Sequence, residues 1–165
     1  MRIRSADETD ASAVTSLWTE AYAKAGPEGR QEPYALQEYF AVGASADVRV
    51  AVDDADEVVA VAAIFPPGAP GRSVAGPREA EFARLAVARR ARLQGIARAL
   101  VEGCTEQAHE FGAEAIALWS RPYQSAAHGL YESLGYRRVA ERDHEDRDGH
   151  RWVFRLDLGG GTLPR

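Results

Sequence analysis

Apolar residues recur along the first third of the chain with the spacing of helices. In Ala11–Ala23 they fall three and four residues apart, directly behind the turn and cap residues of Asp7–Asp10. A Gly/Pro break at Gly26–Gly29 ends this pattern. A second, shorter helix is expected over Tyr34–Val42, starting beside Pro33. The pattern therefore predicts two helices in succession before residue 45.

Alternating or unbroken apolar runs predict the strands. In Asp47–Val52 the three valines share one face, and a polar turn separates this run from the nearly continuous apolar run Val58–Phe65. This pair is typical of a hairpin. Further strands are expected at Arg2–Ser5, Glu79–Val87, Ala113–Trp119, Tyr136–Glu141 and Arg151–Leu158.

Two more helices complete the pattern. Gly95–Phe111 carries a continuous apolar stripe and ends before Gly112, and Ser125–Leu134 ends before Gly135. The order β-α-α-β-β-β-α-β-α-β-β predicts an α+β fold with a mixed, mostly antiparallel sheet and helices on its faces. We expect one domain over residues 1–158, followed by a flexible tail at residues 159–165.

Two segments between these elements are rich in turn-forming or charged residues. Residues 66–78, PPGAPGRSVAGPR, form a long loop, which is either functional or a disordered connection between strands. Residues 141–150, ERDHEDRDGH, are expected to be a solvated hairpin turn.

Composition narrows the class of protein. The chain has 165 residues, of which 45% are apolar and 27% charged, as in globular proteins. Its 25 acidic and 20 basic residues argue against a general nucleic-acid binder. The single Cys104 excludes an internal disulfide, and no Cys/His cluster has metal-site spacing. Without a signal peptide or a long apolar run, we expect a cytoplasmic protein with no metal and no membrane contact.

Arginines gather around one glycine between a predicted strand and a predicted helix. Arg89, Arg90, Arg92 and Arg98 surround Gly95. The first amides of a helix have no partners within it and the helix dipole is positive there, so this turn favours phosphate oxygens. A solvated helix start is the alternative. The Walker A pattern and the G-x-G-x-x-G pattern are both absent, which excludes a P-loop and a Rossmann crevice.

The strand end and the turn together resemble a known motif. Leu85-Ala-Val87, followed by Arg92-Leu-Gln-Gly95-Ile-Ala97, is similar to motif A of the GCN5-related N-acetyltransferase (GNAT) superfamily. The resemblance implies the fold of that family, amides that wrap the pyrophosphate of acetyl-CoA, and a strand end that pairs with its pantetheine arm. The implied cofactor-binding residues are Leu85, Ala86, Val87, Arg92, Leu93, Gln94, Gly95, Ile96, Ala97, Arg98 and Gln124.

A second segment matches the same family independently. Residues 124–136, QSAAHGLYESLGY, resemble motif B, and Tyr131 falls on the tyrosine often proposed to protonate the departing thiolate of coenzyme A. Three residues depart from the usual pattern: Gln124 replaces asparagine, Arg89 replaces proline and Tyr136 replaces phenylalanine. Both motifs stand in the expected order, and the resemblance covers residues 2 to 157.

The implied reaction is direct attack of an amine on the acetyl thioester in a ternary complex. An alkyl amine with a pKa of about 10.4 is neutral in only roughly one molecule per thousand at pH 7. A general base therefore helps. Glu81 is our candidate, on the strand that carries Leu85 and Val87, with Glu79 behind it. A solvent-facing strand residue is the alternative for Glu81.

Residues of the first two helices face the acceptor side in this family. Trp18, Tyr22, Tyr34 and Tyr39 lie there, and core packing is the favoured role for most of them. The acceptor itself, a small-molecule or peptide amine, is left open by the sequence, as are the acyl group and a homodimer.

Two other classes of function stay open at this point. One is a non-catalytic acyl-CoA-binding regulatory module on the same fold. The other is an interaction protein whose arginines contact RNA or an acidic partner, which the acidic composition disfavours.

Overall fold

The computed structural model describes residues 1–22 and 33–159, and the chain forms two compact units. Unit 1 consists of Met1–Ile64 and Arg84–Cys104, and unit 2 of Phe65–Ala83 and the chain from Thr105 onward. The predicted single domain over residues 1–158 stays a prediction. Ala23, the predicted break at Gly26–Gly29 and residues 160–165 of the predicted tail lie outside the described residues.

Unit 1 is built on three antiparallel strands and two helices that follow the predicted pattern closely. The elements in its first segment are β1 (Arg2–Ser5), α1 (Ala11–Tyr22), α2 (Leu36–Gly43), β2 (Asp47–Val52) and β3 (Val58–Phe65), the last of which ends in unit 2. The predicted hairpin is confirmed, since β2 pairs with β3 and places Val50 opposite Val61. On its other side β2 pairs with β1, where Val50 lies opposite Arg4.

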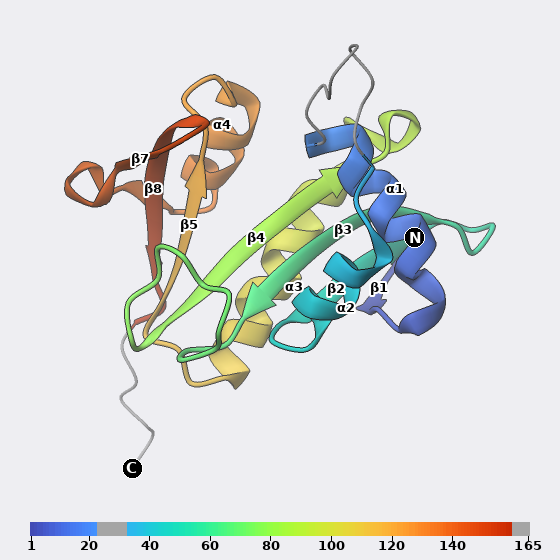
Figure 1. Cartoon of the computed structure of the whole chain (residues 1–165), viewed down its shortest axis with the longest axis horizontal. Coiled ribbons are helices and arrows are strands. Elements are labelled where there is room, and N and C mark those ends of the chain that lie inside the picture. The colour runs from blue at the N-terminus through green and yellow to red at the C-terminus, as the bar shows by residue number, and fades with distance from the viewer. Residues whose placement is uncertain (23–32, 160–165) are drawn as a thin grey trace. The chain divides into compact units, whose positions relative to one another are not determined.

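The 3₁₀ turn at Glu8–Asp10, which leads into α1, is fixed by a partly buried ion pair. Asp7 and Asp10 form a capping box, in which Asp10 accepts a hydrogen bond of 2.8 Å from the Asp7 amide. Arg4 on β1 donates two hydrogen bonds of 2.7 and 2.9 Å to the Asp10 carboxylate. These bonds outweigh the effect of burial and lower the pKa of Asp10. In Figure 1, α1 and α2 lie on one face of the unit 1 strands, and the first turns of α3 (Ile96–Glu110) lie on the other.

Unit 2 holds the remaining strands. Its elements are the first residues of β4 (Glu79–Val87), then β5 (Ala115–Ser120), α4 (Ser125–Ser133), β6 (Arg137–Arg138), β7 (His144–Asp146) and β8 (Gly149–Asp157). The pairing of β4 with β5 is parallel and joins Glu79–Glu81 to Ala115–Ala117. β5, β6 and β7 each pair with β8 in antiparallel fashion.

The strand order confirms the predicted fold class. It runs β1-β2-β3-β4-β5-β8-β6, with β7 attached to β8, so the sheet is mixed and mostly antiparallel. The element order matches the prediction except for the additional short strand β7.

The prediction is wrong at the start of the last hairpin. The expected strand Tyr136–Glu141 shortens to β6 and is followed by a 3₁₀ turn at Ala140–Arg142. The reason is Asp143, whose side chain accepts a 2.8 Å hydrogen bond from the Val153 amide and so replaces a backbone carbonyl in the ladder.

The charged segment 141–150 is a hairpin, as expected, but it contains β7, which the sequence did not indicate. Asp146 on β7 pairs with Arg121 at 3.0 Å and with Arg151 at 2.6 Å. Both guanidinium groups lie over the ring of Trp119, at 4.8 and 4.1 Å from its centroid. A long-range cluster of charge and aromatic surface therefore orders a segment whose local sequence is all polar.

The predicted apolar stripe of α3 is confirmed. Ile96, Leu100, Cys104 and Ala108 are all buried. Burial raises the pKa of the Cys104 thiol to about 12, which agrees with its expected place in the core. No helix within residues 1–22 and 33–159 combines the length and hydropathy needed to cross a bilayer.

Candidate active site

The predicted phosphate turn lies in unit 1 and has an irregular backbone. After β4 the chain makes a 3₁₀ turn at Arg89–Ala91 and then extends at Arg92. Leu93 and Gly95 both adopt left-handed conformations, with φ of 61° and 76°. These two residues turn the chain so that α3 begins directly after Gly95.

The backbone amides of this turn are available to a ligand. Within the described residues, the amides of residues 93–97 donate no backbone hydrogen bond, and the first helical bond runs from the Ala99 amide to the Gly95 carbonyl at 3.1 Å. A Cβ built on Gly95 would meet no atom within 4 Å, so the space beside the amides is open. Several unpartnered N–H groups at the positive end of a helix suit an anion such as a pyrophosphate.

The arginines around the turn contribute less free charge than the sequence indicates. Three of them have carboxylate partners: Arg89 with Glu20 at 3.2 Å, Arg90 with Glu57 at 2.6 Å and Arg98 with Glu102 at 3.9 Å. The fourth, Arg92, donates from Nε to the Val87 carbonyl at 3.3 Å. Backbone amides rather than guanidinium groups are therefore the groups of this turn most available to an anion.

The end of β4 presents backbone groups on the side away from β3. The Ala88 amide donates to Val59 on β3 at 2.8 Å, and neighbouring residues of a strand alternate, so Leu85 and Val87 point the other way. The hydroxyl of Tyr22 donates to the Leu85 carbonyl. Ala86 is buried. Leu85 and Val87 therefore have the orientation that pairing with an extended ligand requires.

Arg84 lies within β4, directly before this segment, and has an unusual backbone conformation. Its φ of 62° lies in the left-handed region, which costs a residue with a long side chain about 1 kcal/mol or more. Trp18 Nε1 donates to its carbonyl at 3.2 Å. Its guanidinium lies over the rings of Trp18 and Tyr34, at 5.1 and 5.3 Å, and Nη1 is 3.4 Å from an oxygen of Glu38.

Sequence reasoning missed Arg84, although it identified the aromatic residues around it. The available signal was an arginine immediately before the L-x-V of motif A, at the end of a largely apolar strand. The fully buried Trp18 confirms the expectation of core packing for that residue.

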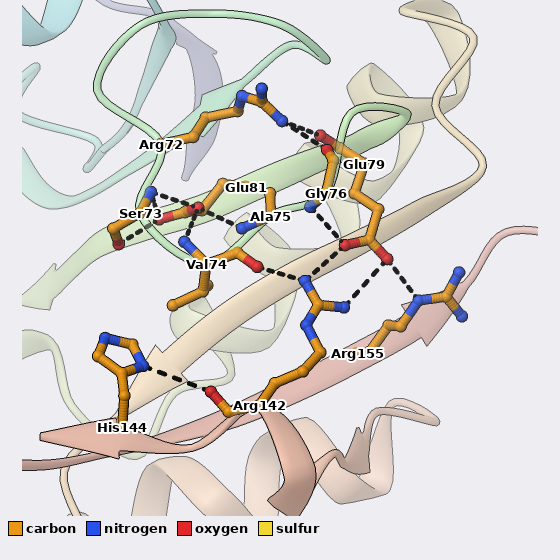
Figure 2. A network of polar contacts seen from close by, with 10 residues as sticks. All are labelled: Arg72, Ser73, Val74, Ala75, Gly76, Glu79, Glu81, Arg142, His144 and Arg155. Atoms are coloured by element: carbon orange, nitrogen blue, oxygen red, sulfur yellow. Dashed lines mark hydrogen bonds and ion pairs between the residues drawn. The ribbon is translucent and has the colours of Figure 1, made fainter.

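The candidate base Glu81 lies in unit 2 and holds the preceding loop (Figure 2). Its side chain is buried, with the residue only 2% exposed, so the alternative of a solvent-facing Glu81 is wrong. Its carboxylate accepts hydrogen bonds from the amides of Ser73, Val74 and Ala75 at 2.8 to 2.9 Å, and from the Ser73 hydroxyl at 3.0 Å. Charged hydrogen bonds of this kind satisfy a buried carboxylate and order the loop around it.

Glu79 is the second buried carboxylate of β4. Its oxygens contact Arg155 at 2.5 Å, Arg142 at 2.8 Å and the Gly76 amide at 2.7 Å. Burial disfavours the charge, but the hydrogen bonds from Arg142, Gly76 and Arg155 outweigh it and lower the pKa of Glu79 to about 2. Such a carboxylate is a weak base at neutral pH.

Two arginines hold the carbonyl groups of the same loop (Figure 2). Arg72 donates to the carbonyls of Gly76 and Glu79 at 2.6 and 3.1 Å, and Arg142 donates to the Val74 carbonyl. The loop at residues 66–78 is therefore an ordered segment with charged anchors, rather than the disordered connection that its composition allowed.

The candidate acid Tyr131 lies on α4 in unit 2. It is buried among three rings, with centroid distances of 6.1 Å to Phe82, 5.7 Å to Tyr136 and 6.2 Å to Phe154. Phe82 follows Glu81 directly on β4, so the two catalytic candidates come from packed neighbouring elements of one unit.

Gln124 organises the connection from β5 to α4. Its Oε1 accepts hydrogen bonds from the Ser120 hydroxyl at 2.9 Å and from the Arg121 amide at 2.7 Å. His128 Nε2 lies 3.2 Å from the same hydroxyl, and its ring stacks on Trp152 at 5.4 Å. The side-chain oxygen of Gln124 is thus engaged within the protein, which leaves its NH₂ group for a ligand.

The predicted site residues therefore form two sets. Residues 85–87 and 92–98 lie in unit 1, whereas Glu81, Gln124 and Tyr131 lie in unit 2. Among residues 1–22 and 33–159, no three His, Cys, Asp or Glu side chains come together as metal ligands. The roles of these residues and the expected absence of a metal stay predictions.

Comparisons with known proteins agree on one family. The sequence profile described as "Acetyltransferase (GNAT) family" matches residues 11–136. The comparison with curated protein sequences gives no match.

Among solved structures, the fold is similar to yncA of Salmonella typhimurium, a putative acetyltransferase determined with its cofactor acetyl-CoA (TM-score 0.75, 20% identity, 100% of this chain and 98% of that chain covered). It is also similar to the ribosomal-protein-S18-alanine N-acetyltransferase of Escherichia coli (TM-score 0.71, 22% identity, 99% of this chain and 98% of that chain covered). A third similar structure is a phosphinothricin acetyltransferase of Sinorhizobium meliloti in complex with acetyl-CoA (TM-score 0.75, 19% identity, 99% of this chain and 91% of that chain covered).

The ion pairs of Glu79 generate a prediction about stability. We expect Glu79→Gln to lower the free energy of unfolding by about 2 kcal/mol at pH 7, because Arg142 and Arg155 lose their counter-charge while partly buried. The lowered pKa stabilises the fold above the ordinary value of 4.5, and this stabilisation is lost as the pH falls towards about 2. The deficit of the variant should therefore shrink over this range in urea unfolding.

The matched control is Glu114→Gln, which removes the exposed partner of Arg78. It should cost at most about 1 kcal/mol. A deficit for Glu79→Gln that is the same at neutral and at acid pH would contradict the ion-pair explanation.

Proposed function

Because the chain belongs to the acetyltransferase (GNAT) family, we propose that it is an acetyl-CoA-dependent N-acetyltransferase acting on a primary amine. The reaction we propose is direct attack of the amine on the acetyl group in a ternary complex. The observation that carries the proposal is the turn before α3, where the amides of residues 93–97 have no backbone partner and Gly95 leaves open space. Similar structures that contain acetyl-CoA support it.

Residues of unit 1 are proposed to hold the donor substrate. The amides from Leu93 to Arg98 face the pyrophosphate, with the guanidinium of Arg92 as additional charge. The backbone groups of Leu85 and Val87 hold the pantetheine arm. Acetyl-CoA itself supplies the acetyl group as an activated thioester.

Tyr131 is proposed to donate a proton from its hydroxyl to the departing thiolate. A thiol has a pKa of about 8.5, so this proton assists departure without being indispensable. The surrounding rings of Phe82, Tyr136 and Phe154 fix the tyrosine side chain, and a fixed donor loses little entropy when it acts.

Glu81 is proposed to accept the proton of the amine through water. To do so, an oxygen must exchange one of its hydrogen bonds from the amides of Ser73, Val74 and Ala75. The same bonds give Glu81 a second role as the anchor of the loop. An experiment must therefore separate proton transfer from positioning.

The acceptor is a small-molecule or peptide amine. One of the similar structures is named as an enzyme for the alanine of a ribosomal protein, and another as a phosphinothricin acetyltransferase. Both kinds of acceptor belong in an assay that follows release of the free thiol over a panel of amines.

Substitution of Gly95 tests the phosphate turn. Gly95→Glu places a carboxylate beside the proposed pyrophosphate and strains a residue with φ of 76°, so the affinity for acetyl-CoA should fall about a hundredfold or more. The control is Gly95→Asn, because asparagine tolerates left-handed backbone and the space around the Cβ is open. Its affinity should stay within about tenfold of that of the wild type. Calorimetry with acetyl-CoA measures both, and no binding to the wild type at millimolar acetyl-CoA would refute the proposed function.

Removal of the Tyr131 hydroxyl tests the acid. Tyr131→Phe keeps the ring among its aromatic neighbours, so the fold and the KM for acetyl-CoA should be retained, while kcat falls about ten- to a hundredfold. Steady-state kinetics of thiol release measure the two constants separately. An unchanged kcat would remove Tyr131 from the mechanism.

Glu81→Gln separates the base from the loop anchor. Loss of a general base lowers kcat about a hundredfold or more and changes the shape of the pH–rate profile. Loss of the anchor alone lowers activity by the same factor at every pH and speeds amide exchange at residues 73–75. We expect the first result, and a proportional loss across the pH range would assign Glu81 to positioning only.

A further inference from the structure

Arg84 has the features of a substrate-binding arginine. We propose that its guanidinium binds the carboxylate of a free amino acid and thereby selects that class of acceptor for acetylation. This inference rests on the proposed function and names the acceptor class for it. It is carried by four residues of unit 1: Trp18, Tyr34, Glu38 and Arg84.

The guanidinium is held by cation–π contacts with two rings, and few of its N–H donors are used by the described residues. It lies 5.1 Å from the ring centroid of Trp18 and 5.3 Å from that of Tyr34. Among the described residues, its polar contact is a single long one, 3.4 Å from Nη1 to an oxygen of Glu38. A guanidinium carries five N–H donors in a planar fork, so the edge of this group can still form a bidentate pair. The side chain is 31% exposed, so part of it is accessible to a ligand.

The backbone fixes the position of this group. Arg84 adopts a φ of 62° inside β4, a conformation that long side chains adopt rarely. The Trp18 indole donates to its carbonyl at 3.2 Å and so holds the strained residue in place. Strain that persists because surrounding contacts determine it occurs mostly at ligand-binding positions. The next residue, Leu85, is the first of the segment proposed to hold the pantetheine arm.

The charges around Arg84 favour a carboxylate over other ligands. A cationic acceptor without a carboxylate would meet the positive guanidinium and gain nothing from it. A dianionic phosphate would be repelled by Glu38, whose half-exposed carboxylate lies beside the same group. A planar monoanion matches the planar fork and keeps the repulsion small. A free amino acid combines such a carboxylate with the amine that the reaction requires.

The test compares matched acceptors and matched variants. The twenty protein amino acids and their C-terminal amides are assayed in pairs for thiol release from acetyl-CoA. For at least one pair, the wild type should use the acid with a kcat/KM at least about tenfold higher than that of the amide, the effect of one hydrogen bond to a charged group.

Variants of Arg84 assign that preference to the guanidinium. Arg84→Asn suits the left-handed backbone and removes the charge. It should raise the KM for the acid about ten- to a hundredfold and leave the KM for the amide within about threefold. Arg84→Lys keeps the charge without the fork and should give an intermediate KM. Arg78→Asn, which removes an exposed arginine paired with Glu114, should keep the preference of the wild type.

The outcomes are distinct. Loss of the acid preference in Arg84→Asn, with activity towards the amide retained, supports the inference. If the wild type uses each amide with the same kcat/KM as the corresponding acid, the inference is overturned and the transferase function stands. An equal loss of activity towards acids and amides in Arg84→Asn has the same consequence. A wild type that binds no acetyl-CoA and releases no thiol with any amine overturns both proposals.

Discussion

The constraint that shapes unit 2 is the need to satisfy two buried carboxylates on one strand. Glu79 and Glu81 enter the protein interior at the start of β4, and burial of an unpaired charge is prohibitively costly. The protein meets this need with arginines from β8 and from the 3₁₀ turn at Ala140–Arg142, and with backbone amides of the loop before β4. The loop takes its shape from the carboxylates, because three consecutive amides must converge on Glu81. A segment rich in proline and glycine is ordered in this way without regular secondary structure.

Local patterns in the sequence were sufficient for most of the fold. The strands β2, β3 and β4 begin and end where the apolar runs do, since each run is buried on at least one face. The turn at Gly95 was predicted for a similar reason, because a glycine between a strand and an amphipathic helix is a local signal.

Features that depend on distant partners were not predictable in the same way. β7 exists because Asp146 pairs with Arg121 and Arg151, and β6 ends early because Asp143 caps Val153. The role of Arg84 depends on two rings, one on α1 and one in the segment before α2, that precede it by more than forty residues. The burial of Glu81 likewise depends on the loop that wraps it. In each case the structural role of a polar residue depends on a residue that is near it in space but distant in sequence. The spacing of apolar residues along the chain does not reveal such a neighbour.

The phosphate turn also has a consequence for the evolution of the chain. The groups that it offers to an anion are peptide N–H groups, which every residue type except proline possesses, and Leu93 and Gln94 are exposed. The anion-binding role proposed for this turn therefore depends on backbone conformation, above all on the left-handed residue at Gly95, more than on the identity of the neighbouring side chains. Most side chains of the turn can change without loss of these amides. Such tolerance is compatible with similar folds that share only about a fifth of their residues with this chain.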